Sequence, residues 1–202
     1  MIDKIKEVMQ EYTPNIYGNH IKSAVLLPLI QVDNEWHILY EVRSSAVSQA
    51  GDSSFPGGKI EAGETNEEAA IRETMEELNL KRENIRNHGE MDYIVSENLI
   101  IYCFVGELID VEFKEIMGNI EVEKVYTVPL EYFIETKPKQ FSVNFNPTLE
   151  KDFTDKQEDN EHEYKLRERA HQIPYYEVDN HSLWGFTANL TERFIKIIRK
   201  SI

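Results

Sequence analysis

Residues 55–80 read FPGGKIEAGETNEEAAIRETMEELNL, and this stretch decides how we expect the chain to fold. Thr65 and Glu68 have the spacing of a capping box, in which two residues bond one another's backbone at the start of a helix. Asn79 tolerates the left-handed conformation in which many helices end. We therefore expect one long helix over residues 65–79, preceded by a glycine-rich turn.

Three carboxylates lie on one side of this expected helix. At roughly 100° per residue, Glu73, Glu76 and Glu77 fall within an arc of about 100°. The opposite side carries the residues expected to face the core, Ile71, Thr74, Met75 and Leu78. Carboxylates at this spacing repel one another unless a positive charge compensates them. A solvated acidic surface is the alternative to a cation site.

The residues around the three carboxylates favour a cation site. Arg72 can orient a carboxylate through its planar guanidinium, and Gly57 and Gly58 let the backbone approach a metal or a phosphate closely. Glu64 adds a fourth carboxylate before the helix. Carboxylate oxygens suit Mg²⁺ or Mn²⁺, and Mg²⁺ usually completes its shell with phosphate oxygens and waters. The pattern therefore predicts a phosphorylated substrate.

The spacing Gly58, Glu64, then Arg72 through Leu80 resembles the Nudix box closely. One departure is Asn79, at a position where that family usually has Gly. The resemblance implies an α/β fold with a mixed β-sheet sandwiched between helices (α/β/α). It also implies a reaction in which water attacks a diphosphate linked to another moiety.

The resemblance also implies roles for individual residues. Glu73, Glu76 and Glu77 would be metal ligands, with the Gly58 carbonyl as an additional ligand. Arg72 would hold the glutamates, and Glu73 is an alternative general base. The catalytic group implied in this way is Glu73, Arg72 and Glu76. A loop residue, Glu97, is another candidate for the base.

Sequence outside the box points to a substrate. Arg43-Ser44, Gly51 and Phe55 through Gly58 resemble the coenzyme A diphosphatase branch of the family, as does the stretch from Trp184 to Ala188. Gln49 stands where that branch usually has His, and Asp52 and Ser53 also differ from it. The expected substrate is coenzyme A or acyl-CoA, with ADP-ribose or a dinucleotide as the alternative. A ligand-sensing module without catalysis is the alternative of another class.

Four residues outside the metal set are expected to contact the substrate. Coenzyme A carries a diphosphate and a 3′-phosphate, so a binding site needs cations near them. Arg43, Lys59 and Arg72 are the nearest basic candidates for that role, and Arg43 and Lys59 belong to the expected substrate-binding set. Gly57 and Glu64 complete the expected substrate-binding set.

Composition indicates one domain and limits the partners. The chain has 202 residues, of which 41% are apolar, so we expect residues 1–202 to form a single domain. A net charge of −15 repels a phosphate backbone, so nucleic acid is not an expected partner. No apolar run has membrane-spanning length, and the N-terminus lacks the pattern of a signal peptide. We expect a cytoplasmic protein, and the sequence leaves a homodimer open.

The remaining sequence predicts the other elements. Residues 2–12 have the apolar spacing of an amphipathic helix, whose apolar side we expect to pack on the domain. Cys103 is expected to be a small residue of a buried strand. A charged insertion is expected at about 136–171. Strands are predicted at 21–30, 36–42, 88–94, 99–109, 121–128 and 173–178, and helices at 130–134 and from 185 onward.

Overall fold

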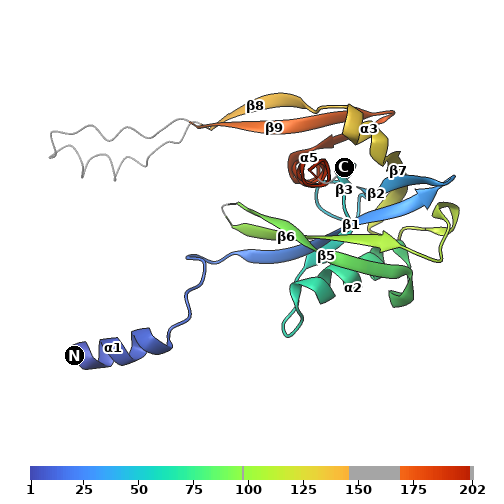
Figure 1. Ribbon diagram of the computed structural model, residues 1–202. Coiled ribbons are helices and arrows are strands. Elements are labelled where there is room, and N and C mark those ends of the chain that lie inside the picture. The colour runs from blue at the N-terminus through green and yellow to red at the C-terminus, as the bar shows by residue number, and fades with distance from the viewer. Residues whose placement is uncertain (97, 146–168, 201–202) are drawn as a thin grey trace.

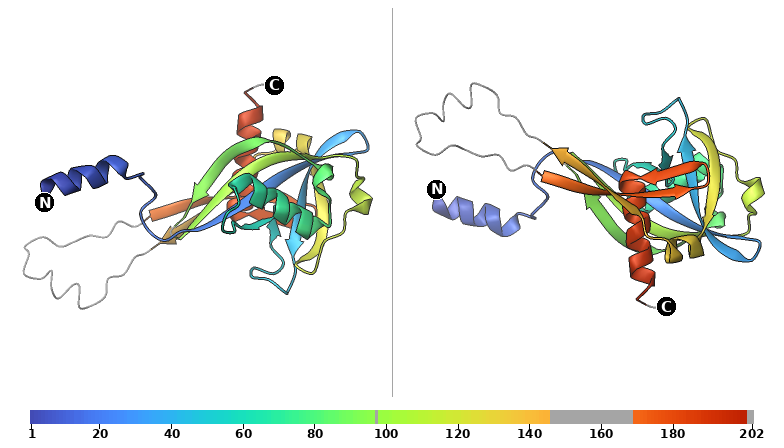
Figure 2. Two further views of the ribbon diagram at one scale, coloured as in Figure 1. Left: turned by 90° about the horizontal axis from the view of Figure 1, so that it is seen from below. Right: turned by 90° about the horizontal axis from the view of Figure 1, so that it is seen from above.

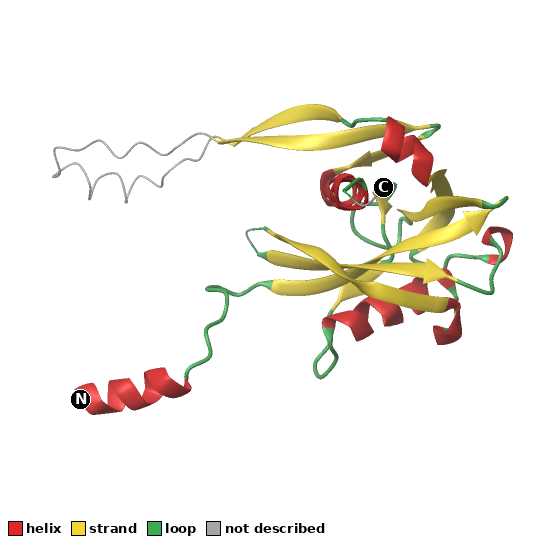
Figure 3. Ribbon diagram, in the orientation of Figure 1, coloured by secondary structure: helices red, strands yellow, loops and turns green. Residues whose placement is uncertain are grey.

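The computed structural model describes residues 1–96, 98–145 and 169–200 (Figure 1, Figure 3). Its helices are α1 (Ile2–Glu11), α2 (Asn66–Leu78), α3 (Leu130–Glu135) and α5 (Gly185–Ile198), with two short 3₁₀ helices at Arg82–Asn84 and Phe113–Glu115. Its strands are β1 (Ile21–Val32), β2 (Glu35–Arg43), β3 (Ser53–Ser54), β4 (Gly57–Lys59), β5 (Ile85–Val95), β6 (Leu99–Leu108), β7 (Val122–Pro129), β8 (Lys139–Phe145), β9 (Arg169–Val178) and β10 (His181–Trp184).

The larger sheet is mixed, as the sequence predicts. β1 lies in its middle and runs parallel to β6, whereas its pairings with β2 and β4 are antiparallel. β5 pairs with β6 at one edge, and β7 pairs with β2 at the other. The β1–β2 hairpin turns at Asp33 and Asn34, whose φ angles of 50° and 67° suit a tight two-residue turn.

β1 and β2 pair with each other only near their hairpin. Their register covers Leu29–Val32 of β1 and Glu35–Ile38 of β2. Beyond that point β4 pairs with Ser23–Val25 of β1, and β3 pairs with Glu41–Val42 of β2. The segment from β3 to β4 therefore lies between two diverging strands, and it carries the glycine-rich turn into the middle of the sheet.

Helices cover both faces of this sheet, so the predicted α/β/α arrangement is confirmed (Figure 1, Figure 2). Side chains that alternate along β2 point to opposite faces. Leu39 packs in the core beneath α2, and its neighbour Tyr40 packs in the core beneath α5. A second sheet, of β8, β9 and β10, joins α3 and α5 on the latter face.

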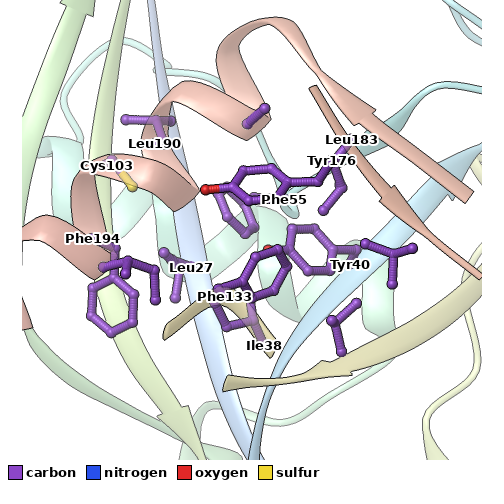
Figure 4. Close-up of a cluster of buried hydrophobic side chains, with 14 residues drawn as sticks. Leu27, Ile38, Tyr40, Phe55, Cys103, Phe133, Tyr176, Leu183, Leu190 and Phe194 are labelled. Atoms are coloured by element: carbon purple, nitrogen blue, oxygen red, sulfur yellow. The ribbon is translucent and has the colours of Figure 1, made fainter. Parts of the chain in front are cut away.

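Tyr40 lies at the centre of the core beneath α5 (Figure 4). Its ring stacks on Phe55 with a centroid distance of 5.1 Å, and its hydroxyl lies 3.0 Å from Oγ1 of Thr191 in α5. Thr191 in turn donates to the carbonyl of Thr187 at 2.8 Å. Cys103 is buried in the same core, as expected, and burial raises its pKa to about 12.

The first helix forms but does not pack as expected. The predicted helix over 2–12 is present as α1, yet none of its residues is buried. Ile2, Val8 and Met9 are 60%, 56% and 61% exposed, and α1 stands apart from the sheet (Figure 1). Helical periodicity reveals that an apolar side exists, but it carries no information about what covers that side.

The predicted insertion at 136–171 begins and ends in strands. Lys139–Phe145 pairs with Arg169–Tyr175, and the sequence did not predict the first of these two strands. Residues 146–168, most of the charged stretch, lie outside the described residues. None of the helices within 1–96, 98–145 and 169–200 combines the length and the apolar character needed to cross a bilayer.

The helix predicted from residue 185 onward forms as α5, and one side of it is buried. Leu190 and Phe194 are buried, but Phe186 is 41% exposed. Ala188 and Ile195 complete the buried side in its place. Phe186 lies in the first turn of the helix.

Replacing Tyr40 with Phe tests the link between α5 and the sheet. Tyr40→Phe keeps the stacked ring but removes a buried hydrogen bond, so we expect the free energy of unfolding to fall by about 1 kcal/mol. Urea denaturation measures this, and Tyr12→Phe, at an exposed position, is the control. Equal stability of Tyr40→Phe and the native protein would contradict the role given to this hydrogen bond.

Candidate metal and substrate site

The helix that carries the three carboxylates forms as predicted. The backbone nitrogen of Glu68 donates to Oγ1 of Thr65 at 3.2 Å, and the backbone nitrogen of Thr65 donates to Oε2 of Glu68 at 2.8 Å. Asn79 ends the helix with a φ of 51° and a ψ of 41°, in the left-handed region. The capping box and the Asn79 stop are thus both confirmed.

Arg72 joins the carboxylates to the glycine-rich turn. Its Nε and Nη2 donate to the two oxygens of Glu64 at 3.1 and 2.8 Å, a forked pairing. Nη1 lies 2.9 Å from Oε1 of Glu73 and 3.3 Å from Oε2 of Glu76. Nη2 also donates to the carbonyl of Lys59 at 3.2 Å. One guanidinium therefore contacts three carboxylates, compensates part of their charge and connects α2 to β4.

Glu77 lies deeper than the other carboxylates of α2. Its side chain is buried, with the residue only 4% exposed, and its Oε2 accepts a 2.7 Å hydrogen bond from the backbone nitrogen of Gly57. Burial, followed by repulsion from Glu41, raises the pKa of Glu77 to about 8. Glu77 therefore faces the glycine-rich segment and not bulk solvent, whereas the side chain of Glu76 is 57% exposed.

The two glycines of the turn are required by close packing. A Cβ at Gly58 would lie 2.4 Å from Oε1 of Glu73, and a Cβ at Gly57 would lie 2.4 Å from the carbonyl oxygen of Ala24. The carboxylate of Glu73 thus rests directly on the backbone of Gly58. Burial raises the pKa of Glu73, while its contact with Arg72 acts in the opposite direction.

Glu41 is a residue of this site that sequence reasoning missed. It is 1% exposed, and Ser54 Oγ donates to its Oε1 at 2.9 Å. Within the described part of the chain, its Oε2 is buried and has no hydrogen-bond partner. Burial, the largest cause, raises the pKa of Glu41 to about 7. A glutamate inside a β-rich run belongs to no spaced motif, so burial in the structure is the only signal.

The expected substrate-binding residues take different positions. Arg43 is held at the end of β2, where its Nε donates to the carbonyl of Ser48 at 2.8 Å and its own carbonyl accepts from Gly51 at 2.8 Å. Lys59 reaches the site through its carbonyl, while its side chain is exposed. Gln49, a departure from the resemblance, adopts a left-handed φ of 58°.

Glu64 and Gly57 already form hydrogen bonds within the protein. Glu97 lies outside the described residues. Arg72 binds both oxygens of Glu64, which also accepts from the backbone nitrogen of Glu61 at 2.6 Å. The nitrogen of Gly57 is bonded to Glu77. These contacts position Arg72 and Glu77, and substrate contact by Glu64 or Gly57 stays a prediction.

The chemistry of the donors fits a divalent cation. Hard carboxylate oxygens gather here, and one of them, Oε2 of Glu41, is buried without a partner in the described structure. Among the described residues, however, no three His, Cys, Asp or Glu side chains already converge as a ligand set. Glu73 and Glu76 contact Arg72 in this arrangement.

Comparisons with known proteins show the family of the chain. Residues 20–147 match the NUDIX domain, which is more than half of the chain. The chain belongs to the Nudix hydrolase family. Nudix hydrolase 3 of Caenorhabditis elegans is 32% identical to it over 117 residues, 55% of this chain and 49% of that protein. The chain therefore spans about half the length of that relative.

Two further matches cover nearly the whole Nudix chain. The mouse mitochondrial coenzyme A diphosphatase NUDT8 is 24% identical over 200 residues, 96% of this chain and 86% of that protein. The crystal structure of a MutT/nudix family protein from Enterococcus faecalis aligns with a TM-score of 0.55 at 11% identity, covering 98% of this chain and 70% of that one. At this identity the structural match supports the fold alone.

The buried carboxylates predict how stability depends on pH without metal. Glu41 and Glu77, with pKa values of about 7 and 8, keep protons in the folded state at pH values where unfolded glutamates have lost them. Their contribution to the free energy of unfolding is therefore fully present below the pKa of an unfolded glutamate. It is lost as the pH rises through the folded-state pKa values of about 7 and 8. We expect urea denaturation in EDTA to show lower stability at pH 8.5 than at pH 5.5.

Glu77→Gln isolates this effect because glutamine keeps an acceptor for Gly57 but does not ionise. The stability difference between the two pH values should shrink in Glu77→Gln and persist in Glu67→Gln, a control at an exposed position of the same helix. If all three proteins show the same difference, Glu77 does not titrate in this way.

Proposed function

We propose that the chain is a metal-dependent diphosphatase that hydrolyses a nucleoside diphosphate derivative, with coenzyme A or acyl-CoA as the substrate. The observation that carries this proposal is the set of glutamates on α2 beside the glycine-rich segment: Arg72 contacts Glu73 and Glu76, and the backbone nitrogen of Gly57 donates to Glu77. Family membership is consistent with it. The intact set argues against a ligand-sensing module without catalysis.

The residues of the box have separate roles in this proposal. Glu73, Glu76 and Glu77, with the Gly58 carbonyl, would hold Mg²⁺ or Mn²⁺. The cation, when bound, neutralises charge on phosphoryl oxygens and lowers the pKa of a bound water. Arg72 positions the carboxylates, and Glu73 is placed to accept a proton because burial raises its pKa.

The substrate assignment is supported by residues outside the box. Coenzyme A offers a diphosphate and a further phosphate, and Arg43 supplies a cation on the same strand as Glu41, held in place by the loop that follows it. The mouse relative that aligns with 96% of the chain bears the name of a coenzyme A diphosphatase. Gln49 and Asp52 depart from that branch, so ADP-ribose or a dinucleotide is the second candidate.

Other expectations about partners and location stay predictions. The proposed partner is a small phosphorylated molecule, and the net charge of −15 disfavours nucleic acid. A homodimer remains open. The cytoplasmic location also stays a prediction, and the mouse relative is named as mitochondrial.

Arg72→Lys tests whether the guanidinium positions the carboxylates. Lysine keeps the charge but cannot bind Glu64 in a fork while contacting Glu73 and Glu76, so kcat should fall by about 10- to 100-fold. Arg86→Lys is the control, because Arg86 makes an exposed ion pair with Glu107 away from the site. Unchanged kcat in Arg72→Lys would show that charge alone is sufficient.

The function itself is tested by incubating the purified protein with coenzyme A and Mg²⁺ or Mn²⁺. The expected products are 4′-phosphopantetheine and adenosine 3′,5′-bisphosphate, separated by chromatography. Glu76→Gln should lower the metal-dependent rate by more than about tenfold, while Glu67→Gln on the same helix should not.

Parallel assays with ADP-ribose and a dinucleoside polyphosphate decide between the substrates. A higher kcat/KM for either of these would overturn the coenzyme A assignment and keep the reaction class. No hydrolysis of any of the three would overturn the diphosphatase proposal. Full activity of Glu76→Gln would remove Glu76 from the ligand set.

A further inference from the structure

Glu41 reaches the acidic site from the sheet and not from the helix. It stands on β2 where β1 and β2 diverge, opposite Ser54 of β3 and Val125 of β7. Leu39, two residues earlier, and Val125 both pack in the core beneath α2. Alternation along the strand therefore directs the Glu41 side chain to the face of the sheet that α2 covers.

The carboxylate of Glu41 is buried without sufficient compensation. Ser54 satisfies Oε1, but Oε2 is buried and unpartnered within the described residues. Leaving a charged oxygen in this state is costly unless a ligand completes its shell. Glu121 and Glu73 add like charge near Glu41, whereas Arg43 is a positive group that acts on both Glu41 and Glu77.

Among the described residues, the arginines near the site form no ion pair with this buried pair of carboxylates. Arg72 contacts Glu64, Glu73 and Glu76, and its contacts do not extend to Glu41 or Glu77. Arg43 directs its Nε to the carbonyl of Ser48. Within the ranges that the structure describes, neither Glu41 nor Glu77 forms an ion pair.

We propose that Glu41 is a further ligand of the divalent cation, supplied by β2 in addition to the glutamates of α2. Its unpartnered Oε2 is the donor, and the hydrogen bond from Ser54 holds the carboxylate in place. The cation would then connect the central sheet to α2. This inference rests on the proposed function, because it presumes that the glutamates of α2 bind a metal.

Mn²⁺ binding to the 202-residue chain without substrate tests this inference. Electron paramagnetic resonance measures the concentration of free Mn²⁺ and so gives the Kd for Mn²⁺. It is applied to the native protein, to Glu41→Gln and to the control Glu35→Gln. Glu35 is the exposed first residue of the same strand. Glu41→Gln should raise the Kd by at least about tenfold, and Glu35→Gln should leave it unchanged.

The free energy of unfolding in EDTA at pH 8 shows whether Glu41 serves as a metal ligand or as a carboxylate that the fold requires. Glutamine keeps an acceptor for Ser54 and removes the unpaired charge, so Glu41→Gln should be at least as stable as the native protein. A loss of stability with an unchanged Kd would mean that Glu41 serves the fold, and would overturn the inference.

The failure of this inference is distinguishable from failure of the proposed function. If the native protein binds Mn²⁺ and Glu41→Gln binds it equally well, Glu41 is not a ligand and the diphosphatase proposal stands. If the native protein binds no Mn²⁺, both are overturned.

Discussion

The Arg72 guanidinium contacts Glu64, Glu73, Glu76 and the carbonyl of Lys59, and the arrangement of the site depends on these contacts. Carboxylates at adjacent positions on one side of a helix repel one another, and a planar guanidinium can contact several of them at once. By binding the turn and the helix together, Arg72 sets the distance between α2 and β4. The same contacts hold Glu73 and Glu76 in the absence of a metal.

The divergence of β1 and β2 places the rest of the site. Because the two strands separate beyond their hairpin, β3 and β4 fit between them and present the nitrogen of Gly57 to Glu77 and the hydroxyl of Ser54 to Glu41. Two carboxylates from different elements are thus buried with little positive charge near them. A protein that buries negative charge in this way is stabilised by a cation that binds the folded state.

Local patterns predicted the helix well because its signals are local. Thr65, Glu68 and Asn79 act on their immediate neighbours, so their spacing alone indicates where α2 begins and ends. Glu41 could not be found in this way, because its burial results from strands that are distant in sequence. The same limit applies to α1, whose apolar residues predicted packing that the structure does not show, and to Lys139–Phe145, whose strand pairs with residues beyond a charged stretch.

The central claim is that the carboxylates around Arg72 form a divalent cation site. Anomalous X-ray scattering at the manganese edge, from crystals of the full chain soaked in Mn²⁺, tests this claim most directly. We expect an anomalous peak between α2 and the β3–β4 turn, within coordination distance of Glu77 and at least one of Glu73 and Glu76. A peak elsewhere on the protein, or no peak at saturating Mn²⁺, would contradict it.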